Sequence, residues 1–159
     1  MHIYWLDADV YIQAKNGPYK FARVPKFWSF ISEQLEKETI KSPQVVYGEI
    51  AEGKDDLANW FKPRRRKGLC VPASEKVQEY YGQIAAYVAQ HYKPHQAAEF
   101  LKGGDGWVIA HALESGGVVV TQESARSRKN KVKIPTICKA FGVRCINTYT
   151  MLDELKARF

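Results

Sequence analysis

Five acidic residues stand where a folded chain could gather them into one site: Asp7, Asp9, Glu49, Asp105 and Glu123. Two of them follow the apolar run 2–6 and one follows the β-branched run 118–121, and both runs are typical of buried strands. Ligands bind outside the carboxyl ends of the strands in an open parallel sheet, so acids that follow strands meet at one edge. A cluster of carboxylates repels itself unless a positive charge lies among them. We therefore expect this set of residues to bind a cation.

The donor atoms of this set indicate which cation binds and which reaction follows. Carboxylate oxygens without Cys or His are hard ligands, which favour Mg²⁺ or Mn²⁺. Two such ions about 4 Å apart can activate a water molecule and stabilise the leaving oxygen of a phosphodiester. The predicted chemistry is metal-dependent hydrolysis of phosphodiester bonds. For any one of these acids taken singly, the alternative is a structural role as a helix cap or turn residue.

The elements that must position these acids follow from the apolar pattern. Short apolar runs predict strands over residues 2–6, 69–72, 118–121 and 144–147. Spacings of three and four, with caps and prolines, predict helices over 26–38, 44–52, 56–62, 74–93, 107–114 and 134–141 and at the C-terminus. We expect Ser42 to be the N-cap of the second helix. Alternating strands and helices predict one α/β domain over 1–159, a three-layer α/β/α sandwich with a central, mostly parallel sheet.

Composition limits the classes to which the chain can belong. The 159 residues are 45% hydrophobic, which is enough for a sizeable core and excludes a disordered or fibrous protein. The formal charge of +7 attracts anions such as phosphate backbones. No run is long enough for a membrane span and the start lacks the features of a signal peptide, so we expect a cytoplasmic protein. The cysteines lack zinc-site spacing, and we expect reduced core thiols at Cys70, Cys138 and Cys145.

The order and spacing of four motifs resemble those of the PIN domain nucleases. The motifs are a strand ending in D-x-[ND] at 6–9, a helical glutamate within 46–50, an aspartate opening an alanine-rich helix at 104–112, and a strand followed by T-x-acid at 119–123. Further tracts at 133–138, 141–147 and 151–155 are similar to those of a PIN-like subfamily of prokaryotic proteins, which resemble VapC-type toxins. The resemblance covers nearly the whole chain and implies a PIN-like fold.

The resemblance also implies a role for each acid. Asp7, Glu49, Asp105 and Glu123 would be the catalytic residues and the ligands of Mg²⁺ or Mn²⁺, with Glu123 standing where most PIN domains carry an aspartate. Asp9 occupies a position where the family often has Asn or Ser, and it would act through hydrogen bonds around the metal. Thr121 resembles a hydroxyl residue that many members place beside the metal, where it would orient water or a phosphate oxygen.

Two basic tracts are candidates for binding a nucleic acid backbone. The first is Arg64, Arg65, Arg66 and Lys67, and the second is Arg126, Arg128, Lys129, Lys131 and Lys133. The second tract follows Glu123 directly, so we expect it to form a basic rim beside the acidic cleft. The alternative for both tracts is a solvated loop without a partner.

The leading hypothesis is a metal-dependent endoribonuclease that cuts single-stranded or looped RNA. The resemblance implies the toxin of a type II toxin-antitoxin system, whose cognate antitoxin inserts a segment into the cleft and blocks it. It leaves open whether that antitoxin carries a helix-turn-helix domain and whether this chain forms a homodimer. The alternatives are a non-catalytic RNA-binding PIN-like module and a structure-specific DNA nuclease. The retained acids favour an active enzyme over the first alternative, whereas the residues themselves do not separate RNA from DNA.

Overall fold

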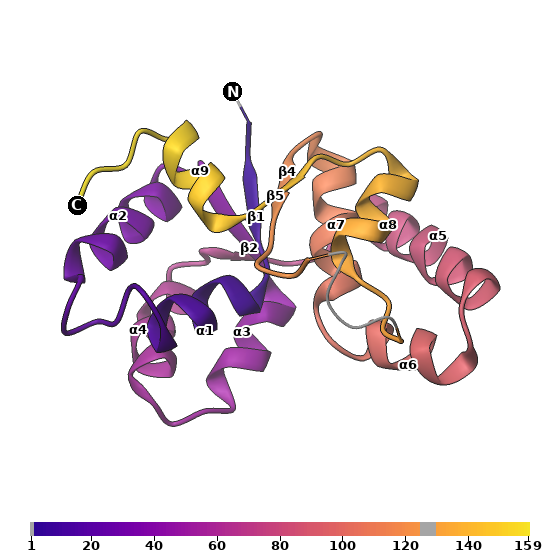
Figure 1. Ribbon diagram of the computed structural model, residues 1–159, viewed down its shortest axis with the longest axis horizontal. Helices are drawn as coiled ribbons and strands as arrows, with labels where there is room; N and C mark the ends of the chain where they lie inside the picture. Colours follow the sequence, from indigo (N-terminus) through magenta and orange to yellow (C-terminus); the bar gives the residue numbers. More distant parts are fainter. Residues whose placement is uncertain (1, 125–129) are drawn as a thin grey trace.

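A parallel sheet runs through the middle of the protein, with helices packed on both of its faces (Figure 1). The computed structural model describes residues 2–124 and 130–159, without the side chain of Arg65. Within this part of the chain, α1 to α4 and α9 lie on one side of the sheet and α5 to α8 lie on the other (Figure 1). The predicted three-layer α/β fold is confirmed.

The sheet order is β3-β2-β1-β4-β5, and every neighbouring pair is parallel. The strands are β1 (Tyr4–Leu6), β2 (Ile40–Pro43), β3 (Cys70–Val71), β4 (Val118–Val120) and β5 (Cys145–Ile146). Strand β1 lies at the centre, where Tyr4 is opposite both Ile40 and Val118. The chain order reverses on either side of β1, so the ends of β1 and β4 form the switch point at which such sheets bind ligands.

The helices cover the sheet through apolar stripes. They are α1 (Ala8–Asn16), α2 (Pro25–Glu36), α3 (Gln44–Ala51), α4 (Asp56–Arg66), α5 (Glu75–His91), α6 (Pro94–Lys102), α7 (Asp105–Ser115), α8 (Ile134–Phe141) and α9 (Thr148–Glu154). Helix α7 is buried along most of its length because it packs against β1, β2 and β4 and under α5. This position fixes the N-terminal end of α7 at the carboxyl edge of the sheet. None of the helices in the described residues is long and apolar enough to cross a membrane.

Three elements were absent from the sequence prediction. Helix α1 begins directly after β1 with no intervening turn, because Asp7 both ends the strand and caps the helix. Strand β2 contains one apolar residue besides its proline, which is too weak a pattern for a strand. Helix α6 begins at Pro94, the residue expected only to end α5.

Two local predictions were wrong, and one holds only in part. Ser42 does not cap α3, since it lies buried in β2, donates to the carbonyl of Leu6 at 2.9 Å and shares a hydrogen bond of 2.7 Å with the Tyr11 hydroxyl. Pro63 does not end α4, which continues to Arg66. All three cysteines are free thiols, but only Cys70 and Cys138 are buried, whereas Cys145 is half-buried.

Candidate active site

Asp7, Asp9 and Thr121 form a hydrogen-bonded group where β1 and β4 end. Asp7 is the N-cap of α1, and its Oδ1 accepts from the backbone N–H of Asp9 at 3.2 Å. The Thr121 hydroxyl donates to Asp7 Oδ2 at 3.0 Å, with Asp9 Oδ2 farther away at 3.5 Å. Burial raises the pKa of Asp7 well above its usual value, and repulsion from Asp9 and Asp105 adds to the effect.

Asp105 is the first residue of α7 and faces the same edge of the sheet. Burial, together with repulsion from Glu123 and Glu49, raises its pKa to about 7. Lys131 acts in the opposite direction but does not cancel these effects. The negative charge of Asp105 is therefore buried beside other carboxylates, and Lys131 compensates it only in part.

Glu49 and Glu123 each accept a hydrogen bond from a backbone N–H at the start of a helix. Glu49 Oε1 accepts from the backbone N–H of Gly104 at 2.5 Å, and Gly104 is the N-cap of α7. Glu123 Oε1 accepts from the backbone N–H of Ile134, the first residue of α8, at 2.7 Å. Helix N-termini favour negative charge, so both carboxylates are stabilised where they lie. Burial nevertheless raises the pKa of Glu49, against the effect of its hydrogen bond to Gly104.

The site therefore combines buried charge with partial compensation. Burial raises the pKa values of Asp7, Glu49 and Asp105, while Asp7, Glu49 and Glu123 each accept a hydrogen bond from a backbone N–H. The donor set consists of oxygen atoms, as hard divalent ions require, and the excess negative charge is what such an ion would offset. In the described part of the chain, no three His, Cys, Asp or Glu side chains already enclose an ion position. The donors fit Mg²⁺ or Mn²⁺ in chemistry.

Four of the acids, Asp9, Glu49, Asp105 and Glu123, line a groove made of three hollows. The first, of about 620 Å³, is lined by Glu49, Asp105 and Lys131 among others, and we call it the carboxylate hollow. The second, of about 460 Å³, includes Asp9, Glu123, Lys131 and Lys133, and we call it the lysine hollow. Lys131 belongs to both, so the two hollows are neighbours.

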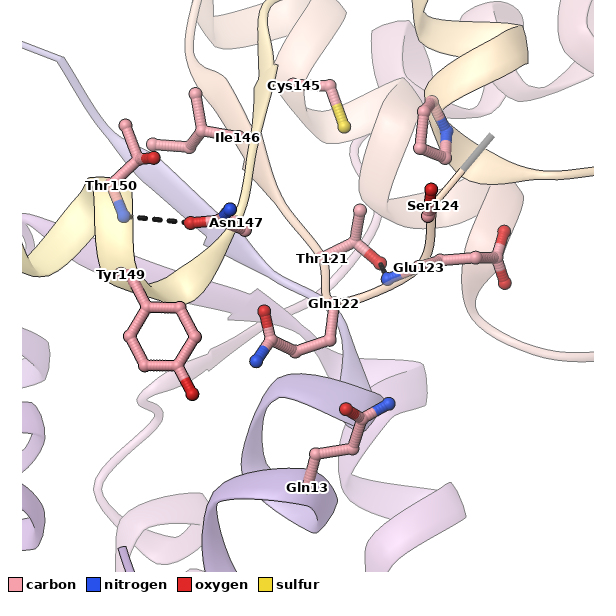
Figure 2. A pocket seen from close by; sticks show the side chains of 11 residues that line it. Gln13, Thr121, Gln122, Glu123, Ser124, Cys145, Ile146, Asn147, Tyr149 and Thr150 are labelled. Carbon is pink, nitrogen blue, oxygen red and sulfur yellow. Dashed lines mark hydrogen bonds between the residues drawn. The ribbon is translucent and has the colours of Figure 1, made fainter. Parts of the chain in front are cut away.

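The third hollow continues the groove beyond the carboxyl ends of β4 and β5. It has a volume of about 600 Å³ and shares Gln13, Gln122, Glu123 and Ser124 with the lysine hollow. Figure 2 shows Gln13 on α1, Gln122 after β4 and Tyr149 on α9 around this space. We call it the tyrosine hollow. None of these three residues was predicted from the sequence, in which the position of Gln122 inside the T-x-acid motif is the one signal for any of them.

The structure separates the basic tracts from one another. Lys131 lies 3.4 Å from Glu123 Oε2, between the carboxylate and lysine hollows. Lys133 lines the lysine hollow as well. The other predicted members of this tract, Arg126, Arg128 and Lys129, lie outside the described residues.

The tract at the end of α4 is not brought to the carboxylates. It precedes β3, so it lies at the amino edge of the parallel sheet, opposite the site. Arg64 donates to the Trp60 carbonyl at 2.5 Å and to Ser32 Oγ at 2.9 Å, and its guanidinium lies over the Trp60 ring. Lys67 pairs with Glu36, Arg66 is exposed, and the side chain of Arg65 is outside the described part. Arg64 and Lys67 therefore make contacts within the fold, away from the carboxylates.

Comparisons with known proteins agree with this architecture. A family model described as "Domain of unknown function (DUF4411)" matches residues 4–159. Among curated proteins, none matches this chain.

Several solved structures have a similar fold. VapBC2 from Rickettsia felis, bound to a DNA fragment from its promoter, has a TM-score of 0.55 at 16% identity, covering 91% of this chain and 98% of its own. FitAB bound to an IR36 DNA fragment has a TM-score of 0.53 at 20% identity, covering 91% and 94%. FitAcB from Neisseria gonorrhoeae has a TM-score of 0.54 at 20% identity, covering 92% and 99%. At these identities, the comparison shows a shared PIN-like fold.

Proposed function

The chain belongs to the DUF4411 family, a family of PIN-like domains, and we propose that it is a divalent-metal-dependent endoribonuclease. One observation carries this proposal. Asp7 and Asp105, which are far apart in the sequence, both lie at the carboxyl edge of the sheet. Burial, followed by repulsion from neighbouring acids, raises the pKa of each. A protein keeps such uncompensated charge where a function needs it.

The residues of the site divide the work of hydrolysis among them. Asp7, Glu49, Asp105 and Glu123 would hold Mg²⁺ or Mn²⁺, which supplies an acidified water molecule and polarises the phosphodiester. Thr121 orients the Asp7 carboxylate through the hydrogen bond of 3.0 Å. Lys131 offers a positive charge next to Asp105 and Glu123, where a phosphate oxygen of the substrate can be held.

A cognate antitoxin is the partner that we propose, which makes this chain the toxin of a type II pair. The similar structures named VapBC2 and FitAB are bound to DNA. By analogy, an antitoxin would insert a segment into the carboxylate hollow and would itself bind promoter DNA. The carboxylate hollow would then be closed to RNA while this segment occupies it.

Cleavage of a labelled RNA pool tests the proposal directly. The purified protein is incubated with the pool in chelator, in Mg²⁺ and in Mn²⁺, beside single-stranded and duplex DNA. We expect RNA fragments only with metal, and none from Asp105→Asn. Asp56→Asn is the matched control, because Asp56 is an exposed residue of α4 outside the site and should leave cleavage unchanged.

Each contrary result has a defined meaning. Cleavage of DNA but not of RNA would mean that the substrate is DNA. Metal-independent binding of RNA without any cleavage would identify a non-catalytic module. Equal cleavage by the wild type and by Asp105→Asn would exclude the assigned metal site.

A further inference from the structure

The tyrosine hollow has no role in the chemistry described so far, yet it opens directly from the site. We propose that it binds an unpaired base of the RNA substrate, stacked on the ring of Tyr149. This inference rests on the proposed function and extends it, because it names the part of the substrate that the groove selects. The argument has three parts: an available aromatic face, polar groups beside it and a path for the backbone.

Tyr149 presents the aromatic face. It is 50% exposed, in contrast to the buried Tyr4 and Tyr11. Its ring points into the hollow from the first turn of α9 (Figure 2). Within the described part of the chain, no aromatic ring stacks on Tyr149, whereas Tyr19, Tyr81 and Tyr87 each stack on a neighbouring ring. A base can therefore stack on Tyr149 without displacing another side chain.

Amide side chains beside the ring provide donors and acceptors for a base edge. Gln122 Oε1 accepts from the backbone N–H of Thr148 at 3.3 Å, which fixes the carboxamide. Figure 2 shows the amide nitrogen of Gln122 on the side of Tyr149 and the carboxamide of Gln13 across the space from it. Carboxamides can both donate and accept hydrogen bonds, so these two side chains can bind the edge of an unpaired base.

The groove gives the sugar-phosphate backbone a path from this base to the carboxylates. The tyrosine hollow shares Glu123 and Gln122 with the lysine hollow, whose Lys131 can neutralise a phosphate. Lys131 also lines the carboxylate hollow, where we place the bond that is cut. One strand lying in the groove would have its base on Tyr149, a phosphate at Lys131 and its scissile phosphate near Asp105.

This arrangement selects single-stranded or looped RNA. A base that stacks on Tyr149 must leave its own helical stack, which is inexpensive only where the RNA is unpaired. The predicted preference for single-stranded or looped RNA would thus follow from the tyrosine hollow rather than from the carboxylates.

Binding measured in chelator tests the inference separately from cleavage. Fluorescence anisotropy gives the Kd of a labelled single-stranded RNA, its duplex and an abasic strand of the same length. We expect the wild type to bind the single strand most tightly. Tyr149→Ala should weaken that binding by about fivefold to a hundredfold, the range that follows from losing one base–aromatic stack, and should leave binding of the abasic strand unchanged. Tyr149→Trp should retain binding.

Tyr80→Ala is the matched control, since Tyr80 lies on α5, on the other face of the sheet from α9, and should leave all Kd values unchanged. An unchanged Kd for Tyr149→Ala overturns the inference, and so does an equal loss of binding for the abasic strand. Either result leaves the proposed function standing if metal-dependent cleavage is observed. Absence of RNA cleavage, by contrast, would remove the proposed function whatever the Kd values are.

Discussion

The hydroxyl of Thr121 donates to Asp7 Oδ2 at 3.0 Å, joining residues that are 114 positions apart in the chain. The same oxygen, Thr121 Oγ1, accepts from the backbone N–H of Glu123 at 3.1 Å. Thr121 thus connects the end of β4 to the carboxylate that ends β1, and it also orients the chain that leads to Glu123. A side chain with one donor and an acceptor lone pair is needed for both contacts.

Thr121→Val should keep the shape of this side chain and lose both hydrogen bonds. Removing the donor leaves a buried Asp7 oxygen without a partner, which costs about 1–3 kcal/mol of stability. We expect metal affinity to fall by about 10- to 100-fold, as for other residues that orient metal ligands. Urea unfolding and metal titration measure the two effects. Thr136→Val, on the exposed face of α8, is the control, and identical behaviour of the two variants would contradict the role of Thr121.

Divalent metal should stabilise the folded protein. At about 100 times its Kd, an ion that binds only the native state adds roughly 2.7 kcal/mol, which corresponds to a rise in Tm of about 5 to 10 °C. Asp105→Asn should be at least as stable as the wild type in chelator, because it removes repulsion, and should lose most of this rise. Melting curves in chelator and in Mn²⁺ provide the comparison. An equal rise for both proteins would place the ion elsewhere.

The pKa of Asp105 predicts how stability changes with pH in the absence of metal. Its ordinary value is 3.8 and its value in the folded protein is about 7. Between these values the folded state binds a proton that the unfolded chain does not bind, so this contribution to stability falls as the pH rises from about 4 to about 7. The Tm of Asp105→Asn should therefore increase relative to that of the wild type as the pH rises from about 4 to about 7. A constant difference in Tm would show that Asp105 is ionised throughout.

Gly104 should not tolerate a side chain. A Cβ atom built at this position lies 2.5 Å from Glu49 Oε1 and 3.3 Å from the side chain of Val45. Gly104→Ala should displace Glu49 and lower metal affinity by about 10- to 100-fold. Gly82→Ala on α5 is the control, because nothing lies within 4 Å of its added Cβ atom. Unchanged affinity in Gly104→Ala would mean that the Glu49 position does not matter to the ion.

The two basic tracts should differ in their effect on RNA binding. Lys131→Gln should weaken binding and reduce the slope of log affinity against log salt by about 0.7, the contribution of one phosphate contact on a single strand. Arg66→Gln, at the opposite edge of the sheet, should leave the slope unchanged. Titrations at several salt concentrations measure both. A larger effect at Arg66 would restore the tract on α4 as the RNA-binding surface.

The sequence was most informative where local pattern and long-range position agree. The β-branched run ending at Val120 and the cap at Ser74 predicted β4 and the start of α5 correctly, because these signals are local. Asp7 and Glu123 could be placed at one edge because each follows a strand, and a parallel sheet determines where strand ends lie.

The remaining features depend on contacts that no local pattern encodes. Arg64 belongs to a basic tract that was predicted to bind nucleic acid, but its guanidinium packs on the ring of Trp60, one helical turn before it. Ser42 has the residue type of a cap, yet its partners Leu6 and Tyr11 come from a distant segment. The tyrosine hollow combines α1, the end of β4 and α9, so its residues are neighbours only after folding.

The hydrogen bonds of Glu49 and Glu123 to Gly104 and Ile134 give each glutamate two alternative partners. In the absence of an ion, one oxygen of each carboxylate accepts a hydrogen bond from a helix N-terminus, which offsets part of the repulsion from its acidic neighbours. If the proposed ion takes the same oxygen, it competes with the amide, and its net affinity is the difference between coordination and the lost hydrogen bond. The two helix N-termini would then act as internal competitors of the ion and raise the metal concentration that is needed to fill the site.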